Sequence, residues 1–306
     1  MNTNEVKIHV DISGRLGNQL FQYATARALQ KQYGGKIVLN TYELQRYKDN
    51  FRLELTDFKL NENVIIETEK MIPYGRFLNS LPIKAIRKYC PNLFYSFAAK
   101  FGIIAWKPGL MYKKIPDMSQ YNDIVLYGYF QSAEYFNDIK EIIQDEITPK
   151  FPCVKENKEL YDLIKETESV CITIRRGDYV ANPQYKKMWY VCDENYFNKA
   201  VNEMIKKIPN AVFFVFSDDV QWCKENLNFG RETYYESGND EVWEKVRLMS
   251  ACKHFIISNS SFSWWVQYLS RNQDKLVIAP SSWYNSGPGM NKKVGVYEDH
   301  WTLIKI

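Results

Sequence analysis

Short apolar runs alternate with amphipathic stretches along the second half of this 306-residue chain. The apolar runs are continuous rather than interrupted by polar residues, which is typical of strands covered on both faces. The amphipathic stretches repeat apolar residues at helical spacing. Alternation at these lengths predicts a parallel sheet with helices on both sides. The expected strands are 170–175, 211–216, 234–235, 254–257 and 275–279, and the expected helices are 155–167, 193–208, 218–227, 240–252 and 261–269.

The same alternation opens the chain and indicates a second sheet. A strand, a helix stopped by two glycines and another strand make a βαβ unit. A chain of this length usually divides into two domains, and Thr148-Pro149-Lys150-Phe151-Pro152 interrupts the pattern. The sequence therefore predicts an α/β protein with domains at 1–150 and 151–306. The elements expected in the first domain are strands 7–12, 36–40 and 124–129 and helices 19–33 and 132–147.

Residues 41–122 show the weakest pattern in the chain. They are rich in Tyr, Phe, Lys and Arg, and their apolar runs are short. We expect a largely helical insertion in the first domain, placed where it would shape a pocket for an acceptor.

Polar side chains follow three strands of the second domain where each strand ends. The segments are Arg175-Arg176-Gly177-Asp178, Ser217-Asp218-Asp219 and Ser258-Asn259-Ser260-Ser261, the last of which opens directly into a helix. Open parallel sheets bind ligands outside the carboxyl ends of their strands. Arginine forks and the free N–H groups of a helix start both suit phosphate, and an Asp nearby would accept from a base or a ribose hydroxyl. Together the three segments predict a nucleotide diphosphate site.

Each segment also has a plain structural interpretation. Arg175 and Asp178 would form an ion pair in a surface loop, and the serines and aspartates of the other two segments would cap helices. One such segment alone would favour the structural interpretation, whereas three on one sheet favour the nucleotide site.

A tight turn, Ser13-Gly14-Arg15-Leu16-Gly17-Asn18, joins the first strand to its helix. It matches neither the G-x-G-x-x-G dinucleotide fingerprint nor the phosphate loop that ends in Gly-Lys-Ser/Thr. The bend alone would explain its glycines. The polar residues Arg15, Asn18 and Gln19, carried where a strand opens into a helix, favour a role in a binding cleft.

Composition argues against several kinds of protein. A net charge of +4 and a pI near 8.5 are too mild to indicate nucleic acid binding. Six cysteines without a C-x-x-C pair indicate reduced thiols, with Cys171 and Cys252 in apolar segments. Three histidines, no zinc spacing and no D-x-D triplet predict that no metal or other cofactor is used. The N-terminus lacks a signal-peptide core and no apolar run would span a bilayer, so we expect a cytoplasmic protein.

Four segments resemble motifs of the bacterial alpha-1,2-fucosyltransferases. Gly14-Arg15-Leu16-Gly17-Asn18-Gln19-Leu20-Phe21-Gln22-Tyr23-Ala24 is similar to their N-terminal motif. Ile174-Arg175-Arg176-Gly177-Asp178-Tyr179 is similar to the H-x-R-R-x-D-Y motif that they share with alpha-1,6-fucosyltransferases. Phe216-Ser217-Asp218-Asp219 with Trp222-Cys223, and Ile257-Ser258-Asn259-Ser260-Ser261-Phe262-Ser263-Trp264-Trp265, resemble the later motifs. The segments stand in the family's order, and the last is highly specific.

The resemblance implies two facing Rossmann-like domains, the GT-B-type glycosyltransferase architecture, with GDP-fucose in the C-terminal domain and the last segment packing back on the first domain. It implies a galactoside alpha-1,2-fucosyltransferase of surface polysaccharide biosynthesis. Such an enzyme moves L-fucose to the 2-hydroxyl of galactose in a glycan, with inversion and without metal. Lipid-linked acceptors imply peripheral association with the inner face of the cytoplasmic membrane. Basic residues around Lys84–Lys100 and Lys107–Lys114 suit that contact, and solvated helix faces explain them equally well.

The resemblance also implies roles for particular residues. Arg175 would hold the β-phosphate and stabilise the departing GDP, Asp218 would lie near guanine, and Ser260 and Ser261 near the diphosphate. One departure is Thr173, which stands where the motif has a histidine implied in guanine contact. The residues placed near the donor are Arg175, Arg176, Asp218, Asn259, Ser260, Ser261 and Phe262. Those placed at the cleft or acceptor side are Arg15, Gly17, Asn18 and Gln19.

The chemistry of the motif agrees with this reaction. Cleavage of a sugar–diphosphate bond develops negative charge on the phosphate, which arginine and helix-start N–H groups would stabilise. An inverting attack also needs a group that takes the proton of the acceptor hydroxyl. Asp178 is the nearest carboxylate in the motif, and it would equally well orient Arg175. The alternatives are a fucosyltransferase of another linkage, another nucleotide-sugar donor, and a non-catalytic glycan-binding protein.

Overall fold

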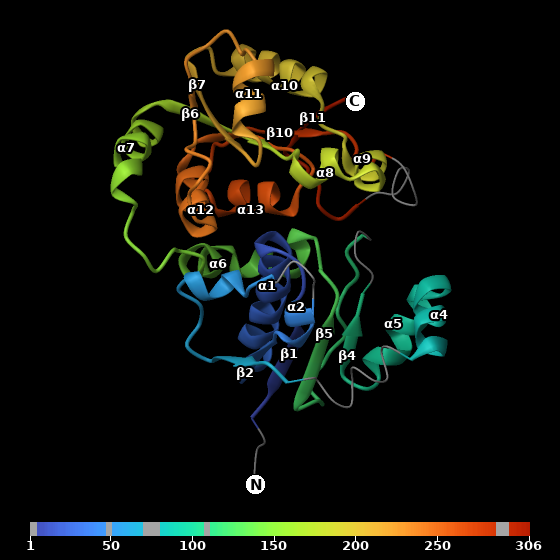
Figure 1. The fold of residues 1–306 in the computed structure, drawn as a ribbon. Coiled ribbons are helices and arrows are strands. Elements are labelled where there is room, and N and C mark those ends of the chain that lie inside the picture. The colour runs from blue at the N-terminus through green and yellow to red at the C-terminus, as the bar shows by residue number, and fades with distance from the viewer. Residues whose placement is uncertain (1–4, 47–50, 70–79, 107–110, 286–293) are drawn as a thin grey trace. The chain divides into compact units, whose positions relative to one another are not determined.

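The computed structural model describes residues 5–46, 51–69, 80–106, 111–285 and 294–306. Internal contacts divide the chain into two compact units, Met1–Glu146 and Ile147–Ile306. Each unit contains one parallel sheet with helices packed on it (Figure 1). The predicted α/β class is confirmed, with two Rossmann-like units that follow each other along the chain. Over the ranges described, no helix is both long enough and apolar enough to cross a bilayer.

The sheet of the first unit has five parallel strands in the order β3-β2-β1-β5-β4. The chain moves from β1 to one edge and then returns from the other edge, so the strand order reverses beside β1. Open sheets bind ligands at such a reversal. The strands are β1 (Lys7–Asp11), β2 (Lys36–Asn40), β3 (Val64–Glu67), β4 (Ile103–Ala105) and β5 (Asp123–Tyr127). The helices are α1 (Leu16–Tyr33), α2 (Tyr42–Arg46), α4 (Leu81–Tyr89), α5 (Pro91–Ala99) and α6 (Lys140–Glu146), with a 3-10 turn at Glu54–Asp57.

The expectation of a largely helical insertion at 41–122 is wrong in an important part. Besides helices, this segment supplies β3 and β4, which pair with β2 and β5 and complete both edges of the sheet. Edge strands of three or four residues carry too little periodicity to be recognised beside amphipathic helices. The parts of that expectation at 47–50, 70–79 and 107–110 lie outside the described residues.

The expected continuous helix at 132–147 is also wrong. Two 3-10 turns, Ala133–Tyr135 and Asn137–Ile139, precede α6. Phe136 interrupts them with φ −148° and ψ 10°, outside the helical region. Its ring is 1% exposed and lies 6.0 Å from that of Phe21. Burial of this ring therefore overrides the helical pattern.

The second unit has six parallel strands in the order β11-β10-β9-β6-β7-β8. Helices α10 and α11 lie on one face of this sheet, and α12 and α13 on the other (Figure 1). Its last strand, β11, belongs to this sheet and was not expected. The strands are β6 (Glu168–Ile174), β7 (Ala211–Ser217), β8 (Thr233–Tyr235), β9 (His254–Ile256), β10 (Val277–Pro280) and β11 (Thr302–Ile304). The helices are α7 (Lys158–Glu166), α8 (Gly177–Ala181), α9 (Pro183–Trp189), α10 (Glu194–Lys207), α11 (Val220–Asn226), α12 (Val242–Ala251) and α13 (Ser261–Leu269).

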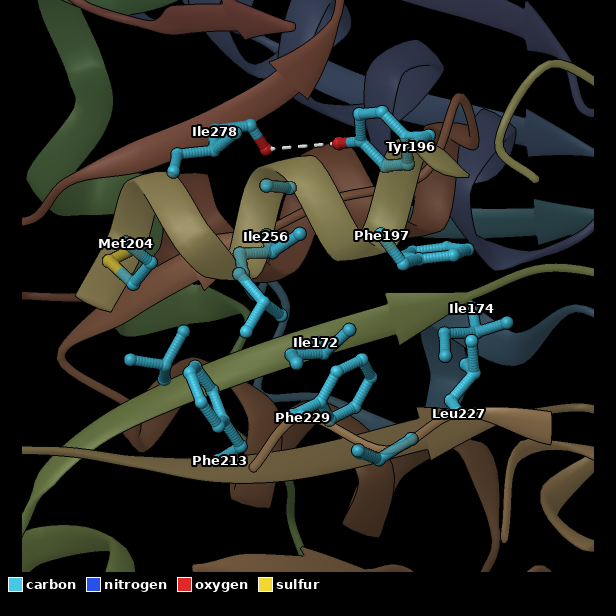
Figure 2. Packing of buried hydrophobic residues seen from close by; sticks show 14 of the residues in the cluster. Ile172, Ile174, Tyr196, Phe197, Met204, Phe213, Leu227, Phe229, Ile256 and Ile278 are labelled. Atoms are coloured by element: carbon cyan, nitrogen blue, oxygen red, sulfur yellow. Dashed lines mark hydrogen bonds between the residues drawn. The ribbon is translucent and has the colours of Figure 1, made fainter. Parts of the chain in front are cut away.

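Alternate residues of β6 build the core beneath α10 (Figure 2). Ile172 and Ile174 are at most 3% exposed and belong to one cluster with Phe197 and Met204 of α10. The hydroxyl of Tyr196 donates to the carbonyls of Ile257 and Ile278, at 2.6 and 3.4 Å, and so ties α10 to the strands. This packing fixes the direction in which β6 delivers the residues that follow it.

Side chains of α13 and β6 are buried in the core of this unit. Trp264 and Trp265 are fully buried, and the indole N–H of Trp264 donates to the carbonyl of Val296 at 2.7 Å. Cys171 and Cys252 are buried free thiols.

The segment between β6 and α10, where no helix was expected, contains α8 and α9. Asn182 caps α9 by accepting from the N–H groups of Gln184 and Tyr185, at 2.9 and 3.3 Å. Pro183 occupies the first turn, where its missing N–H costs nothing. The Asn-Pro pair was therefore a helix start signal.

Candidate functional site

Three polar segments meet at the carboxyl edge of the second sheet, as the sequence predicts. β6 lies between β7 and β9, with Ile174 opposite Ser217 and Ile172 opposite Ile256. The residues that follow these strands therefore emerge side by side. The hydroxyl of Tyr179, after β6, donates to the carbonyl of Asn259, after β9, at 3.4 Å.

Two carboxylates hold the guanidinium of Arg175. Its Nη2 donates to Asp178 Oδ1 and its Nη1 pairs with Asp218 Oδ2, both at 2.7 Å. The other oxygen of Asp218 accepts from the backbone N–H of Arg176 at 2.8 Å. The Arg175 side chain is 23% exposed, and the fork keeps further N–H donors for a ligand.

Glycine at position 177 permits this arrangement. A Cβ atom there would lie 2.8 Å from Asp218 Oδ2, closer than real Cβ contacts come. A larger residue would therefore push Asp218 away from the turn that it holds.

Arg176 is held by its own neighbours and is 13% exposed. Its guanidinium carbon lies 3.4 Å from the ring centroid of Trp222. Its Nε donates to Asp219 Oδ2 at 3.4 Å and its Nη1 donates to the hydroxyl of Tyr190 at 3.3 Å. A stacked and paired arginine of this kind shapes the turn and its positive charge.

Helix α13 begins at the same edge without a side-chain cap. Ser260 is its N-cap residue, and its hydroxyl accepts no hydrogen bond from the first turn. The first N–H groups of a helix, here those of Ser261 and Phe262, have no intrahelical partner. All three residues are partly exposed. The geometry thus sets helix-start donors and the fork of Arg175 on adjacent strand ends, a combination that suits an anion.

Asn259 is 3% exposed, and its side chain is used inside the unit. Its Nδ2 donates to the carbonyls of Trp189 and Trp283, both at 2.9 Å. Its Oδ1 accepts from the thiol of Cys192 at 3.6 Å. The side chain therefore fixes the end of α9 and the segment after β10 to the start of α13.

Thr173 stands where the related motif has histidine. It is 3% exposed, and its Oγ1 accepts from the backbone N–H of Ser258 at 3.0 Å. This bond ties the end of β6 to the segment after β9. The position is therefore part of the scaffold.

The charges at this edge nearly balance. Two guanidiniums, of Arg175 and Arg176, lie among the three carboxylates of Asp178, Asp218 and Asp219. Asp178 is 36% exposed and Asp218 25%. An anion that approaches Arg175 must therefore compete with carboxylates, of which Asp178 is the more accessible. Burial raises the pKa of Tyr179, and Arg175 opposes this in part, so the Tyr179 hydroxyl stays neutral.

The predicted turn of the first unit is held by amide groups. Gly14 has φ +76°, a backbone conformation that favours glycine, and a Cβ there would lie 2.6 Å from Asn18 Nδ2. Gln19 is fully buried, and its Nε2 donates to the carbonyls of Gly14 and Arg52, both at 2.9 Å. Its Oε1 accepts from the N–H of Glu54 at 2.9 Å. Gln19 therefore connects the turn to residues 52–54.

The other polar residues named in this turn have different surroundings. Helix α1 begins at Leu16, so Gly17 and Asn18 belong to its first turn, and Gly17 is buried. Asn18 is partly exposed, and its Oδ1 accepts from Gln131 Nε2 at 3.0 Å. Arg15 is exposed, with its guanidinium 5.5 Å from the ring centroid of Phe51. Arg15 and Asn18 are thus the accessible members of the set.

Sequence reasoning missed two residues of the first unit as site residues: Asp11 at the end of β1 and Gln22 in α1. Gln22 is fully buried; its Nε2 lies 3.0 Å from the carbonyls of Asp11 and Gly128, and its Oε1 accepts from the N–H of Ser13 at 3.1 Å. Asp11 ends β1 where the strand order reverses. Burial first, and Glu43 second, raise the pKa of Asp11 to about 7. The available signal in the sequence was Gln22 itself, a second glutamine one turn after Gln19 on the inward face of the helix.

Two aromatic residues in the second unit were also missed as site residues. Trp222 was noted only as part of a motif, and Tyr190 was not singled out, yet both hold Arg176. Among the described residues, no three His, Cys, Asp or Glu side chains come together as ligands of a metal ion would.

Comparisons with known proteins connect this geometry to a family. The family model described as glycosyl transferase family 11 matches residues 7–305. The chain is 33% identical to an alpha-1,2-colitosyltransferase of Escherichia coli, over 89% of this chain and 91% of that protein. It is 29% identical to the O-antigen biosynthesis glycosyltransferase WbnK of Escherichia coli, over 95% and 98%.

More distant similarities reach a mammalian relative and a solved structure. The chain is 23% identical to the galactoside 2-alpha-L-fucosyltransferase Sec1 of Mus musculus, over 85% of this chain and 64% of that protein. Its fold is similar to that of the NodZ alpha-1,6-fucosyltransferase soaked with GDP-fucose, with a TM-score of 0.51 and 13% identity, over 87% of this chain and 92% of that one. The last similarity concerns the fold alone.

Proposed function

The chain belongs to glycosyl transferase family 11, and on that premise we propose that it transfers L-fucose from GDP-fucose to the 2-hydroxyl of galactose in a glycan, with inversion. The observation that carries this proposal is the Arg175 fork beside the uncapped start of α13. Names of relatives support the sugar class and the linkage: one is a galactoside 2-alpha-L-fucosyltransferase and another an alpha-1,2-colitosyltransferase.

In the proposed donor complex, the diphosphate lies between Arg175 and the first turn of α13. Arg175 stabilises the charge that develops on the β-phosphate as the sugar leaves, and the N–H groups of Ser261 and Phe262 share it. Arg176 adds positive charge without moving, because Trp222 and Tyr190 fix it. No step of this scheme calls for a metal ion, and we propose that the transfer needs none.

The carboxylate of Asp178 changes partner in this proposal. Without donor, it pairs with Arg175 at 2.7 Å. Incoming phosphate oxygens compete for the same fork, since both bind guanidinium in the same planar geometry. Once released, the partly exposed carboxylate is free to take the proton of the acceptor hydroxyl. Asp218 stays in place, because it also holds the backbone of Arg176.

An Asp178→Asn variant tests this role. Assayed for transfer beside the wild type from pH 5 to 9, it should lose most of the transfer rate while it still binds GDP-fucose, because only the proton acceptor has been removed. A transfer rate close to wild type would mean that another group takes the proton.

Guanine recognition in this chain is proposed to differ from that implied for its relatives. Thr173 is committed to Ser258, so it does not contact a base. Asp218 already accepts from Arg175 and from the N–H of Arg176, so a contact with guanine would use its remaining lone pairs. We therefore expect weaker discrimination between GDP and other nucleoside diphosphates than a histidine at position 173 would give.

A colitose donor is a second candidate function. The observation that favours it is the 33% identity to an alpha-1,2-colitosyltransferase over 89% of this chain. Colitose is the 3-deoxy counterpart of fucose, so a site that hydrogen-bonds the 3-hydroxyl would reject it strongly, and an apolar site would not. Parallel assays with the GDP-linked forms of both sugars decide between them.

Calorimetric titration with GDP and then GDP-fucose, in the presence of a chelator, tests the proposal. We expect the wild type to bind both and Arg175→Ala to lose binding, while the control Arg231→Ala, an exposed arginine of the same unit, binds normally. Hydrolysis of GDP-fucose in the absence of acceptor would separate an enzyme from a glycan-binding protein. If neither ligand binds to the wild type, the donor-site assignment is wrong.

A further inference from the structure

Exposed apolar side chains and lysines share one surface of the first unit. Helices α4 and α5 follow each other with only Cys90 between them, and α5 packs on β4 and β5 through Phe94 and Ala98. In Figure 1 both helices lie beside β4. We define the α4–α5 surface by its exposed residues, which are Leu81, Lys84, Ile86, Lys88, Tyr89, Leu93, Phe97, Lys100 and Phe101.

Helix α5 and the turn that follows it carry an apolar stripe on the side away from the core. Leu93, Phe97 and Phe101 are spaced by four residues and are 67%, 48% and 58% exposed. The rings of Phe97 and Phe101 lie 5.2 Å apart. In contrast, Phe94 and Ala98 on the inner side are at most 1% exposed. Apolar residues on both sides of a nine-residue helix predict a second apolar environment outside the unit.

Helix α4 is exposed along nearly its whole length. Leu81 at its start is 83% exposed and Tyr89 at its end 73%, and Ile83 makes contact with the core cluster under α5. Isolated helices of this length are only marginally stable in water, because their few hydrogen bonds do not offset the entropy lost in ordering the first turn. A covering surface would therefore stabilise α4.

The sequence around these helices is uniformly basic. Residues 71–116 contain eight Lys or Arg and no Asp or Glu, although the whole chain has 40 basic and 36 acidic residues. The remainder of the chain is therefore net acidic. Of the lysines described here, Lys84, Lys88 and Lys100 are exposed, and none of them pairs with a described carboxylate. Their charges are available to an anionic partner.

An open groove adjoins the surface and carries more lysines. It lies between α5 and residues 113–121, and three lysines and one carboxylate line it: Lys100, Lys113, Lys114 and Asp117. Lys113 is held over the rings of Tyr95 and Trp106, at 4.4 and 4.9 Å from their centroids, and donates to Asn92 Oδ1 at 2.8 Å. A groove of this kind suits a phosphate group beside an apolar surface.

From these features we infer that the α4–α5 surface binds the surface of an anionic lipid bilayer. Leu93, Phe97 and Phe101 enter the boundary between headgroups and acyl chains, and the lysines contact lipid phosphates, as basic amphipathic helices do. A second copy of this chain is a poorer occupant, because a two-fold contact would set the lysines of one copy against those of the other. The inference does not depend on the donor or the acceptor of the proposed reaction.

Flotation with vesicles tests the apolar part of this surface. We expect the full chain to float with phosphatidylethanolamine–phosphatidylglycerol vesicles and not with phosphatidylcholine vesicles. Phe97→Ser with Phe101→Ser should weaken binding at least tenfold. The control is Phe151→Ser with Leu303→Ser, two similarly exposed residues of the other unit, at 45% and 46%, which should bind as wild type does.

Charge reversal tests the basic part with a matched control. One triple variant, Lys84→Glu, Lys88→Glu and Lys100→Glu, changes the surface, and the other, Lys155→Glu, Lys165→Glu and Lys199→Glu, makes the same change of net charge in the second unit. Each lysine near an anionic bilayer contributes roughly fivefold to binding, so the first variant should lose about 100-fold or more. The second should lose far less. Equal losses would mean that net charge, not this surface, governs binding.

Cys90 provides a probe at the junction of the two helices. It is exposed, Cys153 is partly exposed and the other four cysteines are buried, so a Cys153→Ser chain can be labelled selectively with an environment-sensitive fluorophore. A blue shift with phosphatidylglycerol vesicles, quenched by brominated lipid, places this junction at the bilayer. The inference is overturned if the wild type binds no anionic vesicle, or if it binds while the probe stays in water. Urea unfolding of each variant serves as the control for folding.

Discussion

The turns after β1 and β6 occupy equivalent places in their sheets, but different interactions hold them. Neutral amides hold the first: Gln19 and Gln22 are fully buried and donate mainly to backbone carbonyls. Ion pairs hold the second, where Arg175 contacts Asp178 and Asp218. The hydrogen bonds between these amides and the backbone face no competing ligand. In contrast, an anion can replace a carboxylate as the partner of a guanidinium. The first turn is therefore fixed, whereas the second can exchange partners.

The largest expected effect tests the exchangeable turn. Arg175→Lys keeps the charge but replaces a planar fork by a single ammonium, which cannot hold Asp218 and a phosphate together. We expect transfer to fall by about 100- to 1,000-fold, in the range seen when one transition-state donor is removed. The melting temperature should change little, because the partners are partly exposed. Single-turnover rates with GDP-fucose measure this, and rates within fivefold of wild type would contradict the role of the fork.

The next effect tests the fixed turn. Gln22→Leu leaves the carbonyls of Asp11 and Gly128 and the N–H of Ser13 without a partner in the interior. Buried polar groups left unpaired cost about 1–3 kcal/mol each, and partial relaxation should leave a loss of roughly 3 kcal/mol in the free energy of unfolding. Urea unfolding of the full chain measures it. Gln45→Leu, an exposed helical glutamine of the same unit, is the control.

The two units should respond separately to that variant. GDP affinity should stay within twofold of wild type in Gln22→Leu, because its contacts are all in the first unit. A stability close to wild type would mean that water replaces the amide, and the first turn would then be as adaptable as the second.

A third effect concerns pH and the first turn. The pKa of Asp11 rises from 3.8 to about 7 on folding, so the folded chain holds this proton more tightly than the unfolded chain. The stabilisation of the fold by this protonated carboxyl group is therefore fully present below pH 3.8 and is lost as the pH rises to about 7. The free energy of unfolding falls by at most about 4 kcal/mol over this range, at 1.36 kcal/mol per pKa unit. Asp11→Asn should match wild type at pH 4 and be more stable at pH 8. A constant difference between the two across this range would contradict the raised pKa.

Much of the fold could be predicted because long elements carry their own pattern. The run from Ala211 to Phe216 is apolar throughout, and α10 has a capping Asp193 and an apolar face, so both were placed within two residues. β3 and β4 could not be placed, since their assignment depends on pairing with β2 and β5 rather than on local pattern. Phe136 broke a helix for the same reason, because the position of its ring is decided by a distant contact.

The contacts of the site were likewise predictable only where they are local in the sequence. The pair of Arg175 and Asp178 lies three residues apart in sequence, so spacing alone suggested it. The ion pair between Arg175 and Asp218 depends on β6 and β7 being neighbours in the sheet, which no local pattern reveals. Likewise, nothing in the sequence near Thr173 showed that its hydroxyl would bind the N–H of Ser258. Contacts between strand ends require the strand order, and the strand order is a property of the whole sheet.

The smallest expected effect distinguishes exchange from simple support in the second turn. Asp178→Asn removes the carboxylate that competes with phosphate for Arg175, so GDP should bind about three- to tenfold more tightly. Asp219→Asn is the matched control: it makes the same change of charge at the same edge, next to Arg176, whose position Trp222 fixes. Its effect on GDP affinity should stay below threefold, since it does not touch the fork that the phosphate needs. Calorimetry at two salt concentrations measures both, and the difference between the variants should persist at the higher one because the contact is short. Weaker binding in Asp178→Asn would mean that the carboxylate orients Arg175 for the phosphate, and the second turn would then be as fixed as the first.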